Sequence, residues 1–286
     1  MWEIYINRIK YFAVLILIIA VSLSCSKSGT AGKNIEKNTV TEKHGNTVAV
    51  SKANDSIKIP AGLLKLIKAY PDFLERADEN TLYWKDGTSM MYDDGREKSH
   101  DEKLDNPDLE DMMSQPYTAG ADWDSPPGVN FEPGRIRYEP FFAKMYGKSE
   151  SGVRKNLTTV TWMPGISGTP LLVNTVNEVD IQLRAVCDDL ARLDNEFMKY
   201  VKRTAGTFNY RVIAGTGRLS AHGYGIAIDI NTDYSDYWQW DKSMKYKNKI
   251  PMEIVRVFEN RGFIWGGKWY HYDTMHFEYR PELLVK

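Results

Sequence analysis

The sequence predicts an α+β fold, in which helices pack against a small, mainly antiparallel sheet and an extension precedes them on the N-terminal side. One apolar stripe recurs at three- and four-residue spacing over residues 176–197, which is typical of a long amphipathic helix. Short runs that alternate or are rich in β-branched residues, at 157–163, 207–213 and from Gly225 onward, are typical of strands. Together these patterns indicate the α+β class.

Local sequence patterns also predict a helix and a hairpin in the first half of the chain and a second helix near its end. Residues 63–74 have helical spacing, and residues 82–95 are typical of a hairpin that turns at Asp86-Gly87. Residues 96–134 are charged and rich in proline and glycine, so we expect them to be irregular. A second helix is expected near residues 251–262, because proline favours the start of a helix and glycine its end.

The N-terminus has the features of a secretory signal peptide over residues 1–24. Arg8 and Lys10 precede a short apolar run that ends at Cys25. Leu23-Ser24-Cys25 resembles the lipid-attachment box of bacterial lipoproteins, which implies that Cys25 becomes the lipidated first residue. A plain signal peptide or membrane anchor, with an incidental cysteine, is the alternative.

Composition divides the rest of the chain. Residues 25–58 are polar, poor in aromatic residues and without periodicity, which predicts a flexible tether after the lipidated cysteine. Residues 59–150 are expected to form an accessory region, in which we identify no chemistry. Residues 151–286 are expected to form the domain that carries the functional motifs.

Charge and cysteine content exclude two classes of protein. The 37 basic and 38 acidic residues leave a net charge of -1, so there is no basic surface for nucleic acid, and no nucleic-acid-binding motif is present. Cys25 and Cys187 are the two cysteines, so a disulfide framework is not expected in this exported chain. Cys187 lies beside the apolar stripe of the long helix and is interpreted as a small buried hydrophobe.

The stretch Ser220 to Asp229, SAHGYGIAID, places polar residues where a strand would turn them away from the core. From Gly225 onward, isoleucines alternate with Ala227 and Asp229, so the isoleucines share one face and the carboxylate lies on the other. From Thr274 onward the same alternation places His276 and Glu278 on one face, opposite the apolar Met275, Phe277 and Tyr279.

Two neighbouring strands would thus present His222, Asp229 and His276 to one point on the sheet. Two imidazoles and one carboxylate with a fourth position open are typical of a catalytic zinc site, whereas structural zinc sites fill all four positions and use cysteine. Taken singly, a buried histidine that makes an ordinary hydrogen bond is the commoner alternative.

The order S-x-H-x-x-G-x-A-x-D followed by D-x-x-H-F-E resembles the zinc D-alanyl-D-alanine carboxypeptidase family, over about residues 155–284. This family also includes L-alanyl-D-glutamate endopeptidases and is related to the hedgehog-type fold. The resemblance implies that His222, Asp229 and His276 are the Zn²⁺ ligands and that Asp273 is the catalytic acid and base. Residues 151–286 would accordingly be a zinc peptidase domain.

The resemblance also suggests residues that bind substrate. Tyr210-Arg211 is similar to the family's tyrosine-arginine pair, whose arginine binds a substrate carboxylate. Ten residues separate Arg211 from His222, fewer than is common in the family, so Arg218 is a rival for this role. His271 is expected near the metal as a donor to the transition state, and Ser220 is expected to hydrogen-bond within its loop. Glu278 is expected to orient a ligand histidine.

The implied activity is hydrolysis of peptidoglycan stem peptides by metal-activated water, in a protein anchored outside the cytoplasm through lipid on Cys25. Two other classes stay open: a zinc-bearing wall-binding or signalling lipoprotein that does not hydrolyse peptide, and a structural lipoprotein that needs no metal. The sequence leaves open whether a carboxypeptidase or an endopeptidase acts here, which membrane carries the anchor, and the oligomeric state.

Overall fold

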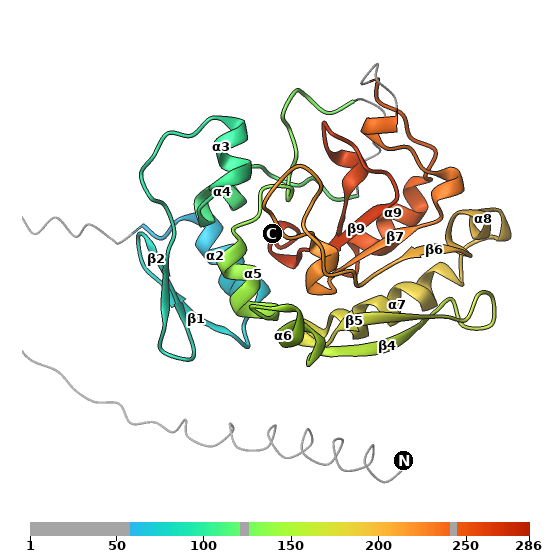
Figure 1. The fold of residues 1–286 in the computed structure, drawn as a ribbon, viewed down its shortest axis with the longest axis horizontal. Helices are drawn as coiled ribbons and strands as arrows, with labels where there is room; N and C mark the ends of the chain where they lie inside the picture. The colour runs from blue at the N-terminus through green and yellow to red at the C-terminus, as the bar shows by residue number, and fades with distance from the viewer. Residues whose placement is uncertain (1–57, 121–125, 241–244) are drawn as a thin grey trace, which may run out of the picture. The chain divides into compact units, whose positions relative to one another are not determined.

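The computed structural model describes residues 58–120, 126–240 and 245–286 (Figure 1). The predicted signal peptide, Cys25 and all but the last residue of the predicted tether lie outside the described residues. Within the described ranges, none of the helices is both long and apolar enough to cross a lipid bilayer.

The first half of the described chain contains short helices and one small sheet (Figure 1). The sheet has the antiparallel order β1-β2-β3, formed by β1 (Leu74–Ala77), β2 (Thr81–Trp84) and β3 (Ser89–Met91). The helices are α2 (Ala61–Ala69), α3 (His100–Asp105), α4 (Leu109–Met113), α5 (Glu139–Tyr146) and α6 (Glu150–Arg154). The predicted hairpin is confirmed, because β2 and β3 pair across the turn at Asp86-Gly87.

The second half contains two more antiparallel sheets. Strands β4 (Leu157–Trp162) and β5 (Thr169–Asn174) form a hairpin. A four-stranded sheet has the order β6-β7-β9-β8 and is formed by β6 (Thr204–Gly206), β7 (Ala227–Ile230), β8 (Phe263–Trp265) and β9 (His276–Tyr279). The helices are α7 (Val179–Leu190), α8 (Met198–Val201) and α9 (Met252–Glu259), so the predicted α+β class is confirmed.

Short 3-10 turns connect these elements. They are η1 (Val176–Glu178), η2 (Asn195–Phe197), η3 (Ala221–Tyr224), η4 (Thr232–Tyr234), η5 (Trp238–Trp240), η6 (Gly266–Lys268) and η7 (Pro281–Leu283).

The helical spacing of residues 63–74 corresponds to a helix that ends at Ala69, since Leu74 already begins β1. Three further sequence expectations differ from the structure. The region 96–134 is not wholly irregular, because Ser99 and Asp108 each begin a short helix with a capping box. The long helix expected over 176–197 is shorter, since α7 ends at Leu190 and the last apolar residues of the stripe reach the core from the turns that follow.

The strand expected over residues 207–213 is the third difference. The chain leaves the sheet after Gly206, and its backbone binds the loop that carries the histidine motif instead of β7. Asn209 donates its backbone N–H to the carbonyl of His222 at 3.1 Å, and Arg211 accepts the N–H of Ser220 at 3.0 Å. Tertiary hydrogen bonds therefore override the β-branched pattern of this segment.

One hydrophobic core joins both halves, and the described residues form a single compact unit. Phe258 of α9 stacks on Phe277 of β9 with ring centroids 3.9 Å apart, which holds the helix against the four-stranded sheet. Phe142 of α5 packs on Tyr224 of η3 at 5.8 Å, so a helix of the first half supports the turn that carries His222. Trp84 is buried in the same core, against Phe141.

Gly225, between this turn and β7, lies in the left-handed region at φ +69°, where a side chain is strained. A Cβ atom there would also lie 2.7 Å from Leu157 Cδ2 and 3.3 Å from the backbone nitrogen of Asn174. We predict that Gly225→Ala lowers the free energy of unfolding by about 1–3 kcal/mol, measured by urea denaturation.

Gly217→Ala is the matched control. No atom lies within 4 Å of a Cβ atom built at Gly217, and its φ is outside the left-handed range. Its unfolding free energy should change by about 0.5 kcal/mol or less. Equal losses in the two variants would show that neither backbone strain nor contact with Leu157 matters at Gly225.

Candidate metal centre

The pairing of β7 with β9 brings two predicted ligands together. Asp229 lies directly opposite His276, and Ala227 lies opposite Glu278. Side chains of directly opposed residues point to the same face of an antiparallel pair, about 4.5–5.5 Å apart at Cβ. The small side chain of Ala227 leaves room beside Glu278, and the larger polar groups occupy this face.

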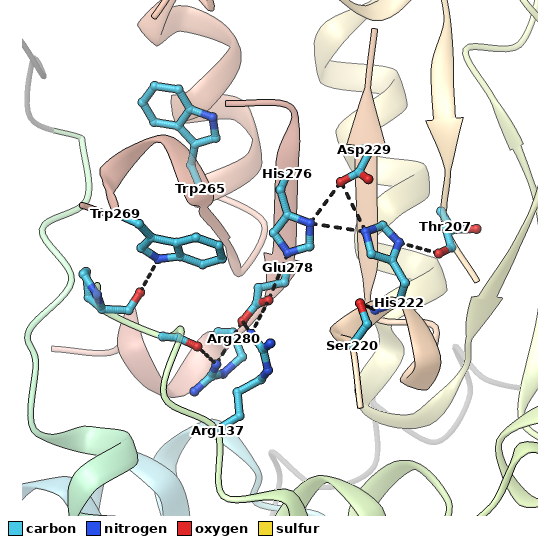
Figure 2. A network of polar contacts seen from close by, with 12 residues as sticks. Arg137, Thr207, Ser220, His222, Asp229, Trp265, Trp269, His276, Glu278 and Arg280 are labelled. Atoms are coloured by element: carbon cyan, nitrogen blue, oxygen red, sulfur yellow. Dashed lines mark hydrogen bonds and ion pairs between the residues drawn. The ribbon is translucent and has the colours of Figure 1, made fainter. Parts of the chain in front are cut away.

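The third predicted ligand comes from the turn that precedes β7. Ser220 begins η3, and its hydroxyl oxygen accepts the backbone N–H of His222 at 3.3 Å. Gly225 ends the turn in the left-handed conformation and returns the chain to the sheet. This short turn places the ring of His222 beside Asp229 and His276 (Figure 2).

Hydrogen bonds on the outer side of the two imidazole rings determine which nitrogens face inward. His222 Nδ1 lies 2.5 Å from the carbonyl oxygen of Thr207, and His276 Nε2 lies 3.0 Å from Glu278 Oε2. Both oxygens can only accept, so these two ring nitrogens carry the hydrogens. In the neutral rings, the lone pairs of His222 Nε2 and His276 Nδ1 therefore point towards Asp229 (Figure 2).

The three inward atoms form a tight triangle. His222 Nε2 lies 3.2 Å from His276 Nδ1, and Asp229 Oδ1 lies 3.2 Å from the former and 2.9 Å from the latter. Ligand atoms about 2.0–2.1 Å from a tetrahedral metal lie roughly 3.3 Å from one another. Three electron-pair donors at this spacing need a cation between them, so the residues fit a divalent metal.

The pKa values of Asp229 and His276 are both shifted in the direction that favours a positive charge at this place. Burial raises the pKa of Asp229, but the neighbouring His222 and His276 outweigh burial and hold it below its usual range. Burial lowers the pKa of His276, but hydrogen bonds to Asp229 and Glu278 outweigh it and raise the pKa to about 10. In the absence of a metal, a proton on His276 supplies the cation, and a metal has to displace it.

Glu278 balances the charge behind the cluster. It is fully buried and accepts hydrogen bonds from Arg137 Nη1 at 3.1 Å and from Arg280 Nη1 at 3.0 Å (Figure 2). Burial raises the pKa of Glu278, but Arg137, His276 and Arg280 outweigh it and keep the pKa below its usual range. Glu278 is therefore an ionised acceptor that holds His276 in one orientation.

One cavity of about 320 Å³ lies over the cluster. All the residues that the sequence singled out for the site line it, except Glu278: His222, Asp229, His276, Asp273, Arg211, Arg218, Ser220 and His271. Asp273 Oδ1 is buried and has no hydrogen-bond partner among the described residues. Burial and the negative charge of Asp229 raise the pKa of Asp273 to about 6.

The other lining residues differ in exposure and contacts. Arg211 is exposed, whereas Arg218 is half-buried and its Nε lies 3.5 Å from Asp105 Oδ1. His271 Nδ1 lies 2.5 Å from Glu132 Oε1, and its ring lies edge-on to Trp238 at 4.5 Å. Because Glu132 accepts the hydrogen of His271 Nδ1, it fixes the orientation of the His271 ring in the cavity.

Glu132, Arg135 and Arg137 come from the expected accessory region, in which the sequence indicated no site residue. Arg135 and Arg137 line the cavity, and Glu132 binds His271 beside it. Residues 132–137 lie outside the helices and strands, so no regular periodicity marked these residues in the sequence.

Comparison with known proteins supports the same chemistry. Residues 214–279 match the family model described as D-alanyl-D-alanine carboxypeptidase, which confirms the family resemblance of the motifs. The matched segment contains His222, Asp229, Asp273 and His276 and supports a peptidase. Searches of curated proteins and of solved structures found no match.

The contacts of Glu278 lead to a prediction for metal affinity. Glu278→Gln keeps an acceptor for His276 Nε2 but removes the negative charge that makes this ring a strong ligand. We expect divalent-metal affinity to fall about 10–100-fold, measured by competition with a chromophoric chelator. His276→Ala removes the ligand itself and should abolish stoichiometric binding.

Glu253→Gln is the matched control, because Glu253 is an exposed glutamate on α9. Its metal affinity should equal that of the wild type. Circular dichroism of the metal-free variants separates a loss of affinity from a loss of fold. A folded Glu278→Gln protein with unchanged affinity would show that Glu278 has no influence on the metal ligands.

Proposed function

We propose that this chain is a zinc-dependent peptidase that cleaves peptidoglycan stem peptides. The main support is that the lone pairs of His222 and His276 point towards Asp229, so that three possible ligands meet at one place. Asp273 lines the same cavity, and its Oδ1 has no hydrogen-bond partner among the described residues. The family match over residues 214–279 supports a peptidase acting on the cell wall.

The donor set favours zinc among the divalent metals. Two imidazole nitrogens and one carboxylate oxygen form the ligand set, and no cysteine lies among them. When bound to such a set, zinc lowers the pKa of a coordinated water to about 7 and polarises a substrate carbonyl. The protein's part is to hold the ligands through Thr207 and Glu278 and to keep the rings in the required tautomers.

Asp273 is the proton carrier in this mechanism. Its Oδ1 has no competing hydrogen bond among the described residues, and its pKa of about 6 lies close to neutral pH. A carboxylate with such a pKa accepts a proton from the attacking water and then donates it to the leaving amine. Burial in a cavity that also holds the ligand cluster places this proton transfer beside the scissile amide.

Basic and polar residues of the cavity orient the peptide. The exposed guanidinium of Arg211 holds a substrate carboxylate, which aligns the amide over the metal ligands. Glu132 orients His271 in the wall of the cavity, where its ring can contact the bound peptide. Ser220 contributes by holding the backbone of His222.

We propose further that the protein acts in the bacterial cell envelope, anchored by lipid on Cys25. The charged and apolar start of the chain and Leu23-Ser24-Cys25 support this location. The polar residues 25–58 would let the folded part reach the cell wall from the membrane.

The Asp273→Asn variant tests the catalytic role. Asparagine keeps the size of the side chain but removes the base, so cleavage of purified peptidoglycan should fall about 10²–10⁴-fold while zinc content stays at the wild-type level. Mass analysis of the released peptides reports cleavage and identifies the bond, and elemental analysis reports zinc.

Two outcomes would contradict this assignment in different ways. Loss of zinc in Asp273→Asn would make Asp273 a ligand, and a loss of activity below tenfold would assign the base to another group. If the zinc-loaded wild type released neither a peptide nor a free amino acid from peptidoglycan, the proposed activity itself would be wrong.

The Cys25→Ala variant tests the location. We expect it to lose labelling by radioactive palmitate and to leave the membrane fraction, because the lipid supplies the anchor. Metal content should be unchanged, since Cys25 is distant in sequence from the ligands. A wild-type protein that takes up no lipid and a variant that stays in the membrane would indicate a plain membrane anchor.

A further inference from the structure

We infer that Arg137 and Arg218 form a second anion-binding subsite, which takes a carboxylate of the peptide other than the one held by Arg211. This inference rests on the proposed function and extends it to the substrate class: a peptide that carries two carboxylates near the scissile bond. It also assigns a role to the first half of the described chain, which supplies Arg137 and much of the wall around it.

The subsite lies where two cavities meet. A larger cavity of about 860 Å³ adjoins the cavity of about 320 Å³ that the candidate metal ligands line. Arg137, Thr216 and Arg218 line both cavities, so they form the boundary between them. Arg96 and Asp105 also line the larger cavity. A peptide bound over the metal can therefore continue past Arg137 and Arg218 into the larger cavity.

Arg218 has donors without a strong acceptor. Its side chain is 17% exposed, and its Nε is buried and makes no hydrogen bond within the described chain. The nearest acid is Asp105, at 3.5 Å, with a side chain that is 64% exposed. A long ion pair to an exposed carboxylate contributes little, whereas a partly buried guanidinium without an acceptor is costly. A substrate carboxylate would supply the missing acceptor.

Arg137 is held in place by a buried partner and keeps donors for a ligand. Its contacts with Glu278 use only Nη1, at 3.1 and 3.4 Å from the two carboxylate oxygens. The side chain is 10% exposed, so the remaining donors have little access to bulk water. Because Glu278 fixes the guanidinium, little side-chain entropy is lost when a carboxylate binds the other nitrogens.

The arginines crowd one another. Burial lowers the pKa of Arg218, and the positive charges of Arg137 and Arg135 lower it further. Arg135 already has an acid partner in Glu132. An anion bound by Arg137 and Arg218 would offset the positive charge that acts on Arg218. The paired oxygens of a carboxylate match the fork of an arginine, which favours this class of ligand.

The loop geometry separates this subsite from Arg211. Residues 211–220 double back on themselves, since Ile213 N–H donates to the Arg218 carbonyl at 2.8 Å and Ser220 N–H to the Arg211 carbonyl at 3.0 Å. The Glu139 side chain of α5 accepts the N–H of Leu219 and ties this loop to the first half of the described chain. Arg211 lines only the metal cavity, whereas Arg218 lines both, so the two arginines serve different carboxylates.

Calorimetric titration of the zinc-loaded full-length protein tests the inference, with Asp273→Asn in every variant so that the probes bind without being cleaved. The probes are two stem tetrapeptides that are identical except for the glutamate α-carboxyl group, which is free in one and a carboxamide in the other. The protein with all its arginines intact should bind the free acid roughly 10–100-fold more tightly, as expected for hydrogen bonds to a charged group. In Arg218→Gln this ratio should fall towards one, and Arg218→Lys should retain part of it.

Arg192→Gln is the control variant, because it removes the same charge from a side chain that is 73% exposed and lines neither cavity. It should keep the ratio of the protein with all its arginines intact. Equal affinities for the two peptides in that protein, an unchanged ratio in Arg218→Gln, or no binding of either peptide would overturn the inference. Binding in the Asp273→Asn background is independent of turnover. If the ratio holds there but the protein with Asp273 intact cleaves nothing, the proposed function is contradicted and the subsite stands.

Discussion

The candidate metal centre depends on the hydrogen bonds that the two imidazole rings make on their outer sides. The carbonyl of Thr207 and the carboxylate of Glu278 both accept, so they assign the hydrogens to His222 Nδ1 and His276 Nε2. In the neutral rings that a metal would bind, the inner nitrogens are electron-pair donors and lie within 3.2 Å of Asp229 Oδ1. If either outer contact were a donor, the neutral ring would turn its hydrogen inward, and that nitrogen would have no lone pair for a metal.

A second group of acids in the same chain shows what distinguishes this cluster. Asp94, Asp108 and Asp111 also lie close together, but Lys98 Nζ lies 3.0, 3.0 and 2.7 Å from them. A lysine thus supplies the positive charge that these carboxylates require. The contacts described for the Asp229 side chain are with the two histidines only, so at that point the chain provides ligands and no cationic side chain of lysine or arginine.

The site is built by both halves of the described chain. Strands β7 and β9 supply Asp229 and His276, and the turn η3 before β7 supplies His222. The segment before α5 supplies Arg137, which lies behind these three residues and binds Glu278. Charge balance explains this arrangement: Glu278 stays ionised in the core because Arg137, His276 and Arg280 surround it. Arg137 thus links the first half of the described chain to the residues behind the candidate ligands.

The α+β class, the alternation of β7 and β9 and the residue types of the candidate site were predictable, because they follow from local periodicity and motif spacing. The strand expected over 207–213 was not correct, because the histidine loop takes its backbone hydrogen bonds. The pairing of Asp229 with His276, the contacts of Thr207 and Glu278 with the two rings, and the contact of Arg137 with Glu278 became known from the structure alone. Strand register and buried ion pairs depend on residues that are far apart in the chain. The local sequence pattern does not show which of these residues will pair.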